Sequence, residues 1–274
     1  MQDIQYILKQ LHNLKEGATK LPSFFIGHGS PMNAVEENDI TRNWKKLGET
    51  LEDIPQAILC ISAHWITRGE TKVHISRTPK QIFDFYGFPE YLYEKKYNPE
   101  WSPKFARETM EMVKKVSIKD DSEWGIDHGT WSVLAQMYPD ANIPIYQISL
   151  DYDKPFSWHF ALAKELQELR KKWVLIIGSG NLVHNLQRMM FWGQPFDWNI
   201  EFDRIVSGQV MDRDFGSILQ KKGVESIFSS AHPTHDHYLP LLYFLWTIDT
   251  QDQLDFFNDT LEMGSISMRS FIAY

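Results

Sequence analysis

The chain has 274 residues, of which 43% are hydrophobic and 23% are charged, as in an ordinary globular protein. It carries 28 Lys and Arg against 36 Asp and Glu, a formal net charge of −8. This balance argues against a nucleic acid or an anionic membrane surface as partner, because both attract a basic face. The length suits one large domain and a sizeable core.

The sequence predicts a cytoplasmic protein. No apolar run approaches the ~20 residues of a membrane span, and the first residues lack the layout of a signal peptide. The single cysteine, Cys60, lies in the apolar run AILCIS, and a lone buried thiol fits a reducing compartment. The oligomeric state is not indicated.

The predicted elements alternate between helices and strands. Ile4, Ile7, Leu8 and Leu11 stand at helical spacing and predict an N-terminal helix within residues 1–20. Buried strands are expected at 21–27, 56–65, 143–151 and 173–181, with further strands at 71–77 and 264–274. Helices are expected at 41–53, 103–116, 155–172, 201–223 and 238–248. Apolar strands separated by helices predict a single α/β domain over residues 1–274, with a mostly parallel central sheet and helices on both faces.

Residues 78–103 predict a long loop rich in Pro, Gly and aromatic side chains. Long loops inside a compact domain are often functional. Its aromatic part, 83–97, would suit the wall of a pocket for a ring-shaped substrate, and core packing explains the same residues equally well.

Four histidines follow or adjoin apolar elements. His28, His64 and His184 come just after three predicted strands, and His237 opens the last apolar helix. In open parallel sheets, ligands bind beyond the carboxyl ends of the strands. We therefore expect these imidazoles to converge on one divalent metal, since imidazoles without nearby thiolates suit zinc or iron. The alternative for each is a hydrogen-bonded structural histidine.

The remaining histidines are less informative. His128, in the segment WGIDHGTW, is expected in a turn, as an acid or base facing a cleft or as a buried hydrogen-bonded residue. His232 and His235 are either neighbours of the metal ligands or solvated. The other three are expected to be surface or packing residues: His12, His74 and His159.

Five ordered motifs carry a family resemblance: GHGSPMNAVE, SAHW, DHGTWSVL, GSGNLVHNL and THDHYLPLLY. Together they resemble the class III extradiol ring-cleavage dioxygenases, and within them the 4,5-DOPA extradiol dioxygenase-like branch, over residues from about 21 to 274. The resemblance implies an α/β domain with a non-haem metal. It implies His28, His64 and His237 as metal ligands, His184 as a ligand or catalytic base, and His128 as a catalytic residue near oxygen and substrate.

The chain departs from this family at His235, where members usually carry Pro. Asp236 is the carboxylate nearest the motif, and we expect it beside the ligand His237 rather than on the metal. Arg68, just past His64, is a candidate for binding a substrate carboxylate, with a solvated strand end as the alternative.

The resemblance implies extradiol cleavage of a catechol, DOPA-like or another small one, with both atoms of O2 entering the product. Ferrous iron is expected for this activity because two or three neutral ligands leave positions open. Zinc is expected in the isolated protein, since it binds nitrogen sites more tightly. A histidine that titrates near neutrality can serve as base or acid. The alternatives are a zinc-dependent hydrolase and a non-catalytic binding protein of the same fold.

Overall fold

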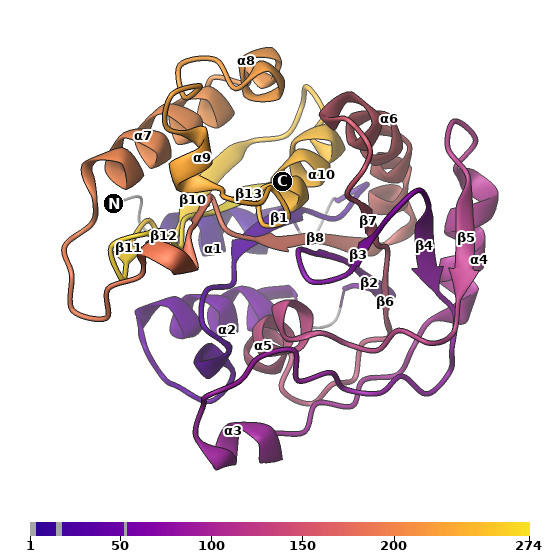
Figure 1. The fold of residues 1–274 in the computed structure, drawn as a ribbon. Coiled ribbons are helices and arrows are strands. Elements are labelled where there is room, and N and C mark those ends of the chain that lie inside the picture. The colour runs from indigo at the N-terminus through magenta and orange to yellow at the C-terminus, as the bar shows by residue number, and fades with distance from the viewer. Residues whose placement is uncertain (1–3, 15–17, 52–53) are drawn as a thin grey trace.

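A six-stranded sheet forms the centre of the molecule, with strand order β10-β13-β1-β8-β2-β6 (Figure 1). The structure is a computed structural model that describes residues 4–14, 18–51 and 54–274. The strands are β1 (Ser23–Gly27), β2 (Ala57–Ser62), β6 (Ile145–Gln147), β8 (Val174–Gly180), β10 (Leu254–Phe257) and β13 (Ser270–Ala273).

The four strands β1, β8, β2 and β6 run parallel. Phe24 of β1 pairs with Ile177 of β8, and Cys60 of β2 pairs with the same residue from the other side. β13 pairs antiparallel with β1 and β10 antiparallel with β13. Every residue of β1, β2 and β8 is buried, as expected of parallel strands covered on both faces.

Helices cover both faces of this sheet (Figure 1). α1 (Ile4–Leu14), α2 (Asp39–Leu51) and α5 (His128–Met137) lie on one face, and α6 (Phe156–Leu166) and α10 (Leu239–Thr247) lie on the other. α10 packs on β8 and β1, and α5 packs on β2. The expected fold class, an α/β domain with a mostly parallel sheet and helices on both faces, is confirmed.

Further helices and strands surround this core. The helices are η1 (Pro31–Ala34), α3 (Glu90–Glu94), α4 (Pro103–Met112), η2 (Gln167–Lys172), η3 (Leu186–Arg188), α7 (Asp197–Met211), α8 (Phe215–Gln220) and α9 (Phe228–Ala231). The strands are β3 (Ile66–Thr67), β4 (Thr71–His74), β5 (Ile118–Asp121), β7 (Leu150–Asp151), β9 (Val183–His184), β11 (Leu261–Glu262) and β12 (Ile266–Ser267). They form three small sheets: β11-β12-β9, β3-β7 and β4-β5.

Several predicted boundaries were wrong. The strand expected at 143–151 is split into β6 and β7, and the helix expected at 201–223 is split into α7 and α8, where the Asp214 side chain caps the start of α8. The expected helix at 155–172 continues after Leu166 as the 3-10 helix η2. β5, β10 and the short α3 were not predicted, because short elements leave too few residues to show a period.

The segment after Asp127 is the main correction. It was expected as a turn and is the start of the ten-residue helix α5, with His128 at its first position. The Asp127 side chain accepts a hydrogen bond from the Thr130 amide at 3.1 Å, an N-cap contact. Apart from Gln136, every residue of α5 is buried, so no polar face marks the helical period.

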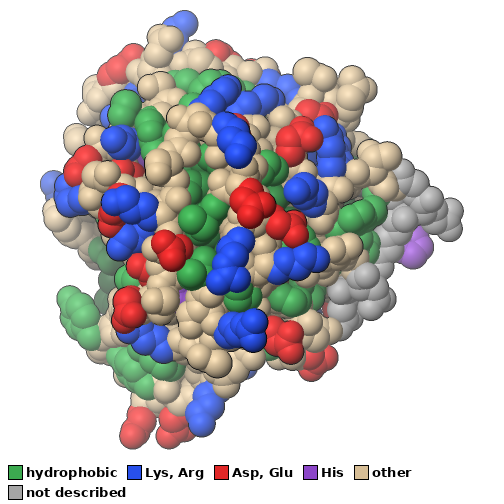
Figure 2. Space-filling view, turned by 90° about the vertical axis from the view of Figure 1, so that its right-hand side faces the viewer, with side chains coloured by type: hydrophobic (Ala, Val, Ile, Leu, Met, Phe, Trp, Pro, Cys, Tyr) green, Lys and Arg blue, Asp and Glu red, His purple; other side chains and the backbone are tan. Residues whose placement is uncertain are grey.

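Among the described residues, no helix combines the length and apolar character needed to cross a membrane. Figure 2 shows acidic and basic side chains interspersed over one face of the molecule.

Candidate metal centre

His28 directly follows β1 at the carboxyl end of the parallel strands. Its backbone amide continues the pairing of β1 with β8 by donating to the Gly180 carbonyl at 3.0 Å. Its Nδ1 lies 3.0 Å from the Ser179 hydroxyl, which in turn donates to the Gly129 carbonyl. The backbone therefore fixes the position of the ring, and Ser179 fixes its rotation, which leaves Nε2 directed toward the neighbouring histidines.

His64 and His128 lie beside each other above the end of β2. Their ring centroids are 4.0 Å apart. A Cβ placed on Gly129 would come within 2.8 Å of the His64 ring and 2.7 Å of the Ser62 hydroxyl. Glycine is therefore required next to His128 because the start of α5 approaches the His64 loop so closely.

His237 reaches the same place from the turn before α10. Its carbonyl accepts from the Asn181 amide at 3.1 Å, and a Cβ on Gly180 would lie 2.3 Å from that carbonyl. The absence of a side chain at Gly180 thus allows the His237 backbone to sit on the end of β8. The His237 Nδ1 lies 2.5 Å from an Asp236 carboxylate oxygen.

The histidines expected at strand ends meet in space. The ring centroid of His28 lies 5.1 Å from that of His64 and 5.2 Å from that of His237, while His64 and His237 are 5.0 Å apart. The His184 ring stacks on His237 at 3.5 Å with an angle of 7° between the planes. His128 joins them, with its ring 5.6 Å from that of His28.

The chemistry of this set fits a metal ion. The Nε2 atoms of His28 and His64 face each other at 3.2 Å, and two nitrogens bound tetrahedrally at ~2.0–2.1 Å would be about 3.3 Å apart. The His237 Nε2 is sealed from solvent and has no hydrogen-bond partner, and such a buried orphan requires an explanation. Nitrogen atoms of His28, His64 and His128 all lie within 4.8 Å of one another and could also hold an ion.

Known proteins resemble this chain over almost its whole length. Residues 22–257 match the family described as the catalytic LigB subunit of aromatic ring-opening dioxygenase. The chain belongs to this family. A 4,5-DOPA dioxygenase extradiol from Escherichia coli K12 is 42% identical over 262 residues, covering 92% of this chain and 94% of that protein. One from Beta vulgaris is 29% identical, covering 94% and 96%.

A solved structure agrees with these matches. The crystal structure of an uncharacterized Escherichia coli K12 protein superposes with a TM-score of 0.80 at 37% identity, covering 92% of this chain and 99% of that one. The predicted enzyme class, an extradiol ring-cleaving dioxygenase acting on a catechol, is confirmed by the family and the relatives. Members of the LigB family use a single metal, and the histidine cluster is where this chain can hold one.

Burial and neighbouring imidazoles keep most of the clustered histidines neutral. Burial, followed by the charges of His64 and His237, lowers the pKa of His28 well below its usual value. Burial and then His237 do the same to the pKa of His184. Burial also lowers the pKa of His237, although Asp236 partly opposes this. A neutral imidazole is the form that binds a metal.

Asp84 affects the pKa values of the remaining two histidines, His64 and His128, to different extents. Burial alone would lower the pKa of His64, but its hydrogen bond to Asp84 raises that pKa above the usual value. The pKa of His128 is lowered by burial and by His64, and Asp84 offsets this only in part. The Asp84 carboxyl, despite its burial, has a pKa held far below its usual range by His128 and His64.

The other candidate histidines lie outside the ring cluster. His232 is buried between Phe202 and Tyr238, and its Nε2 lies 2.9 Å from the Leu182 carbonyl. His235 stacks on Tyr152 at 3.9 Å. Neither contact places the ring against a proposed ligand.

Arg68 and the three histidines expected to be structural also have partners or positions elsewhere. Arg68 is paired with Asp153 at 2.6 Å at the surface, with its side chain 67% exposed. His12 is exposed, whereas His74 and His159 are buried. His159 lies 3.0 Å from the Tyr243 hydroxyl, a packing role as expected.

Sequence reasoning missed two polar residues of the site, Asp84 and Ser179. Ser179 lies inside the apolar strand β8, and only its inward position reveals it. Asp84 is flanked by Phe83 and Phe85 in the aromatic loop, and an acidic residue between two aromatic ones was the available signal.

Proposed function

We propose that this protein opens the ring of a catechol, DOPA-like or another small one, with ferrous iron held by the histidine cluster. The observation that carries the proposal is the pair of Nε2 atoms of His28 and His64 facing each other at 3.2 Å, beside the orphaned Nε2 of His237. The substrate class rests on relatives named 4,5-DOPA dioxygenase extradiol in bacteria and plants.

The proposed ligands are His28, His64 and His237, with His184 beside them. His28 and His64 belong both to the set whose nitrogens lie within 4.8 Å of one another, which His128 completes, and to the set that the family resemblance implies, which His237 completes. The choice of His237 over His128 rests on the family resemblance and on the His237 Nε2, which is buried and has no hydrogen-bond partner. Both rings are hydrogen-bonded through Nδ1, to Asp236 and to Asp84, and His128 lies against the aromatic loop. This assignment leaves His128 free for proton transfer.

A bound ferrous ion would supply the redox chemistry and the open positions that join a catechol to dioxygen. The residues of the chain would handle the protons. His184, stacked on His237, is proposed as the base that takes a proton from a catechol hydroxyl. His128, whose Nδ1 is bonded to Asp84 and whose Nε2 is then unprotonated, is proposed to take up the second catechol hydroxyl proton and to give that proton to oxygen during cleavage. Their lowered pKa values leave both neutral before reaction.

The aromatic loop 83–97 is proposed as one wall of the substrate site. Phe85 places its ring edge-on to His128 at 5.4 Å and also packs on Phe88 and Tyr93 at 5.3 and 5.2 Å. A cluster of rings next to the proposed acid offers the apolar contact that an aromatic substrate needs.

Metal replacement tests the function directly. We propose that the isolated protein carries zinc and is inactive, because zinc outcompetes ferrous iron at nitrogen sites and has no redox chemistry. Loading with ferrous salt under argon should restore oxygen uptake with a catechol panel, with two oxygen atoms recovered in the ring-opened product. An iron-loaded protein that consumes no oxygen with any catechol would favour a hydrolase or a binding protein instead.

We also propose that residues 1–274 form one catalytic domain of a cytoplasmic enzyme. β13 pairs with β1 and β10 near the end of the chain, and α1 packs on α2, so both ends of the described chain belong to the same core. The free buried thiol of Cys60 suits a reducing compartment.

A further inference from the structure

One carboxylate contacts two of the clustered histidines. Asp84 lies between β4 and α3, and its side chain is 21% exposed. Its Oδ1 accepts from the His128 backbone amide at 3.0 Å and lies 2.9 Å from the His128 Nδ1. Its Oδ2 lies 3.0 Å from the His64 Nδ1.

This arrangement fixes the direction of both rings. An ionised carboxylate only accepts hydrogen bonds, so each Nδ1 must donate, and each neutral ring then keeps its free lone pair on Nε2. For His64 that lone pair faces the Nε2 of His28. For His128 the unprotonated nitrogen is Nε2, on the side of the ring away from Asp84.

The loop that carries Asp84 is held by aromatic packing. Phe83 and Phe85 lie on either side of it in sequence, and both pack on Trp131 of α5, with centroid distances of 5.5 and 6.1 Å. α5 begins at His128. The aromatic loop and the start of α5 are therefore joined both by apolar contact and by the Asp84 carboxylate.

We propose that Asp84 is a positioning residue that aligns the metal ligand His64 and the proton-transfer residue His128 with a single carboxylate, and so links the aromatic wall to the metal centre. This rests on the proposed function for the role of His128. Asp236 provides the contrast, because it contacts one ring of the cluster, that of His237. Loss of Asp84 should disturb metal binding and turnover together.

The test uses the full-length protein with Asp84→Asn, which preserves size, and Asp84→Ser, which removes the carboxyl group. Asp39→Asn is the matched control, because Asp39 is an acidic residue with a side chain 92% exposed and paired with Arg42. Zinc affinity is measured by competition with a chelator, and the geometry of the site is followed through the visible absorption of the cobalt-loaded protein. Near-UV circular dichroism checks folding.

Asp84→Asn is expected to bind zinc ~10–100-fold more weakly, the usual loss when an outer carboxylate of a ligating histidine is removed. Its cobalt spectrum should change, and Asp39→Asn should match the unmodified protein in both readouts. Asp84→Ser should show the same direction of change. Unchanged zinc affinity and an unchanged cobalt spectrum in both Asp84 variants would overturn the proposal.

Kinetics of the iron-loaded protein test the link to His128. At saturating iron, Asp84→Asn should lower kcat more than it raises KM. In a His128→Phe background it should have little further effect on kcat, because the effects of coupled residues are not additive. Additive losses would overturn the alignment of His128. The zinc and cobalt readouts do not depend on turnover, so they distinguish a failure of this proposal from a failure of the dioxygenase function.

Discussion

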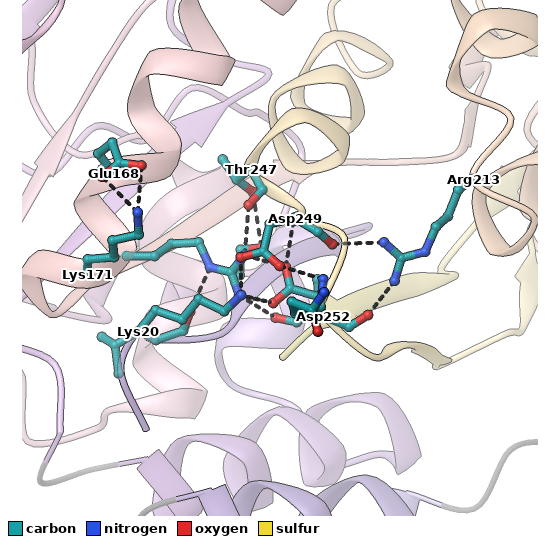
Figure 3. Close-up of polar contacts among 12 residues, drawn as sticks. Lys20, Glu168, Lys171, Arg213, Thr247, Asp249 and Asp252 are labelled. Atoms are coloured by element: carbon teal, nitrogen blue, oxygen red, sulfur yellow. Dashed lines mark hydrogen bonds and ion pairs between the residues drawn. The ribbon is translucent and has the colours of Figure 1, made fainter. Parts of the chain in front are cut away.

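Buried polar groups differ in their hydrogen bonding between the two ends of the parallel strands. At the amino ends, the buried Arg170 guanidinium forms two hydrogen bonds with Asp252, at 2.5 and 3.0 Å, and donates to the carbonyls of Leu21, Thr247 and Ala273. Lys20 adds a second cation at 2.8 Å from Asp252. Figure 3 shows Lys20, Asp249, Thr247 and Asp252 gathered here, with Arg213 donating to the backbone of the same turn.

At the carboxyl ends, the Nδ1 atoms of the clustered histidines have partners such as Asp84 and Asp236, but Nε2 atoms lack them. The Nε2 of His237 is unpaired, and the Nε2 atoms of His28 and His64 have chiefly each other. A buried polar group without a partner costs roughly 1–3 kcal/mol. Buried polar groups that have all their hydrogen-bond partners stabilise the fold. Buried nitrogens that lack partners and converge on one point mark a place for a ligand.

Removing a ligand should produce the largest effect. His28→Ala takes away one of two facing nitrogens, and we expect metal content to fall from one ion per chain to near zero, with turnover lost by more than ~10⁴-fold, beyond the span for loss of an acid or base. Metal analysis and oxygen uptake measure both. Full metal occupancy in His28→Ala would break the comparison, because the facing nitrogens would then not be ligands.

His128→Phe should separate chemistry from metal binding at the same end of the sheet. If His128 transfers a proton and is not a ligand, the variant keeps its metal and loses turnover by ~10²–10⁴. His184→Phe should behave likewise if His184 is the base, and it should lose metal if it is a ligand. Metal content and kcat measured on the same samples decide these roles. Loss of the ion from His128→Phe would make His128 the third ligand.

Arg170→Met tests the amino ends of the parallel strands, where the buried polar groups have their hydrogen-bond partners. It leaves the buried Asp252 carboxylate with Lys20 as its remaining cation, and breaking a buried pair in this way costs about 3–5 kcal/mol. Urea unfolding at neutral pH should show this loss in the free energy of unfolding, while metal content and kcat of the folded protein stay near those of the parent. A loss of metal at full folding would mean that the two ends are not independent.

His159→Gln should produce the smallest effect and sharpens the comparison by pH. Burial, and then the charge of His235, lowers the pKa of His159 to about 4. The unfolded chain therefore binds a proton near pH 6.5 that the folded chain does not, and stability falls as pH drops from about 6.5 toward 4. In His159→Gln the slope over this window should be shallower by up to about 1.4 kcal/mol per pH unit. Parallel slopes in urea unfolding would contradict this.

The sequence predicted the sheet and the residues that line its end. Apolar runs such as those of β1, β2 and β8 show their burial directly, and a polar residue after each run, such as His28 or His64, shows where the strand ends. Because carboxyl ends of parallel strands meet at one edge, residues far apart in the chain could be expected to converge. The family resemblance then assigned roles that strand-end position alone could not.

The tertiary structure decided what local patterns do not encode. α5 has no polar face, so its helical period was invisible and His128 was expected in a turn instead of at a helix start. Asp84 contacts His64 and His128 across 20 and 44 residues of chain, and His235 stacks on Tyr152 instead of joining the histidine cluster. The hydrogen-bond partners of the histidine nitrogens come from segments that are distant in the sequence. Only the packing of the folded chain therefore decides which nitrogens have a partner.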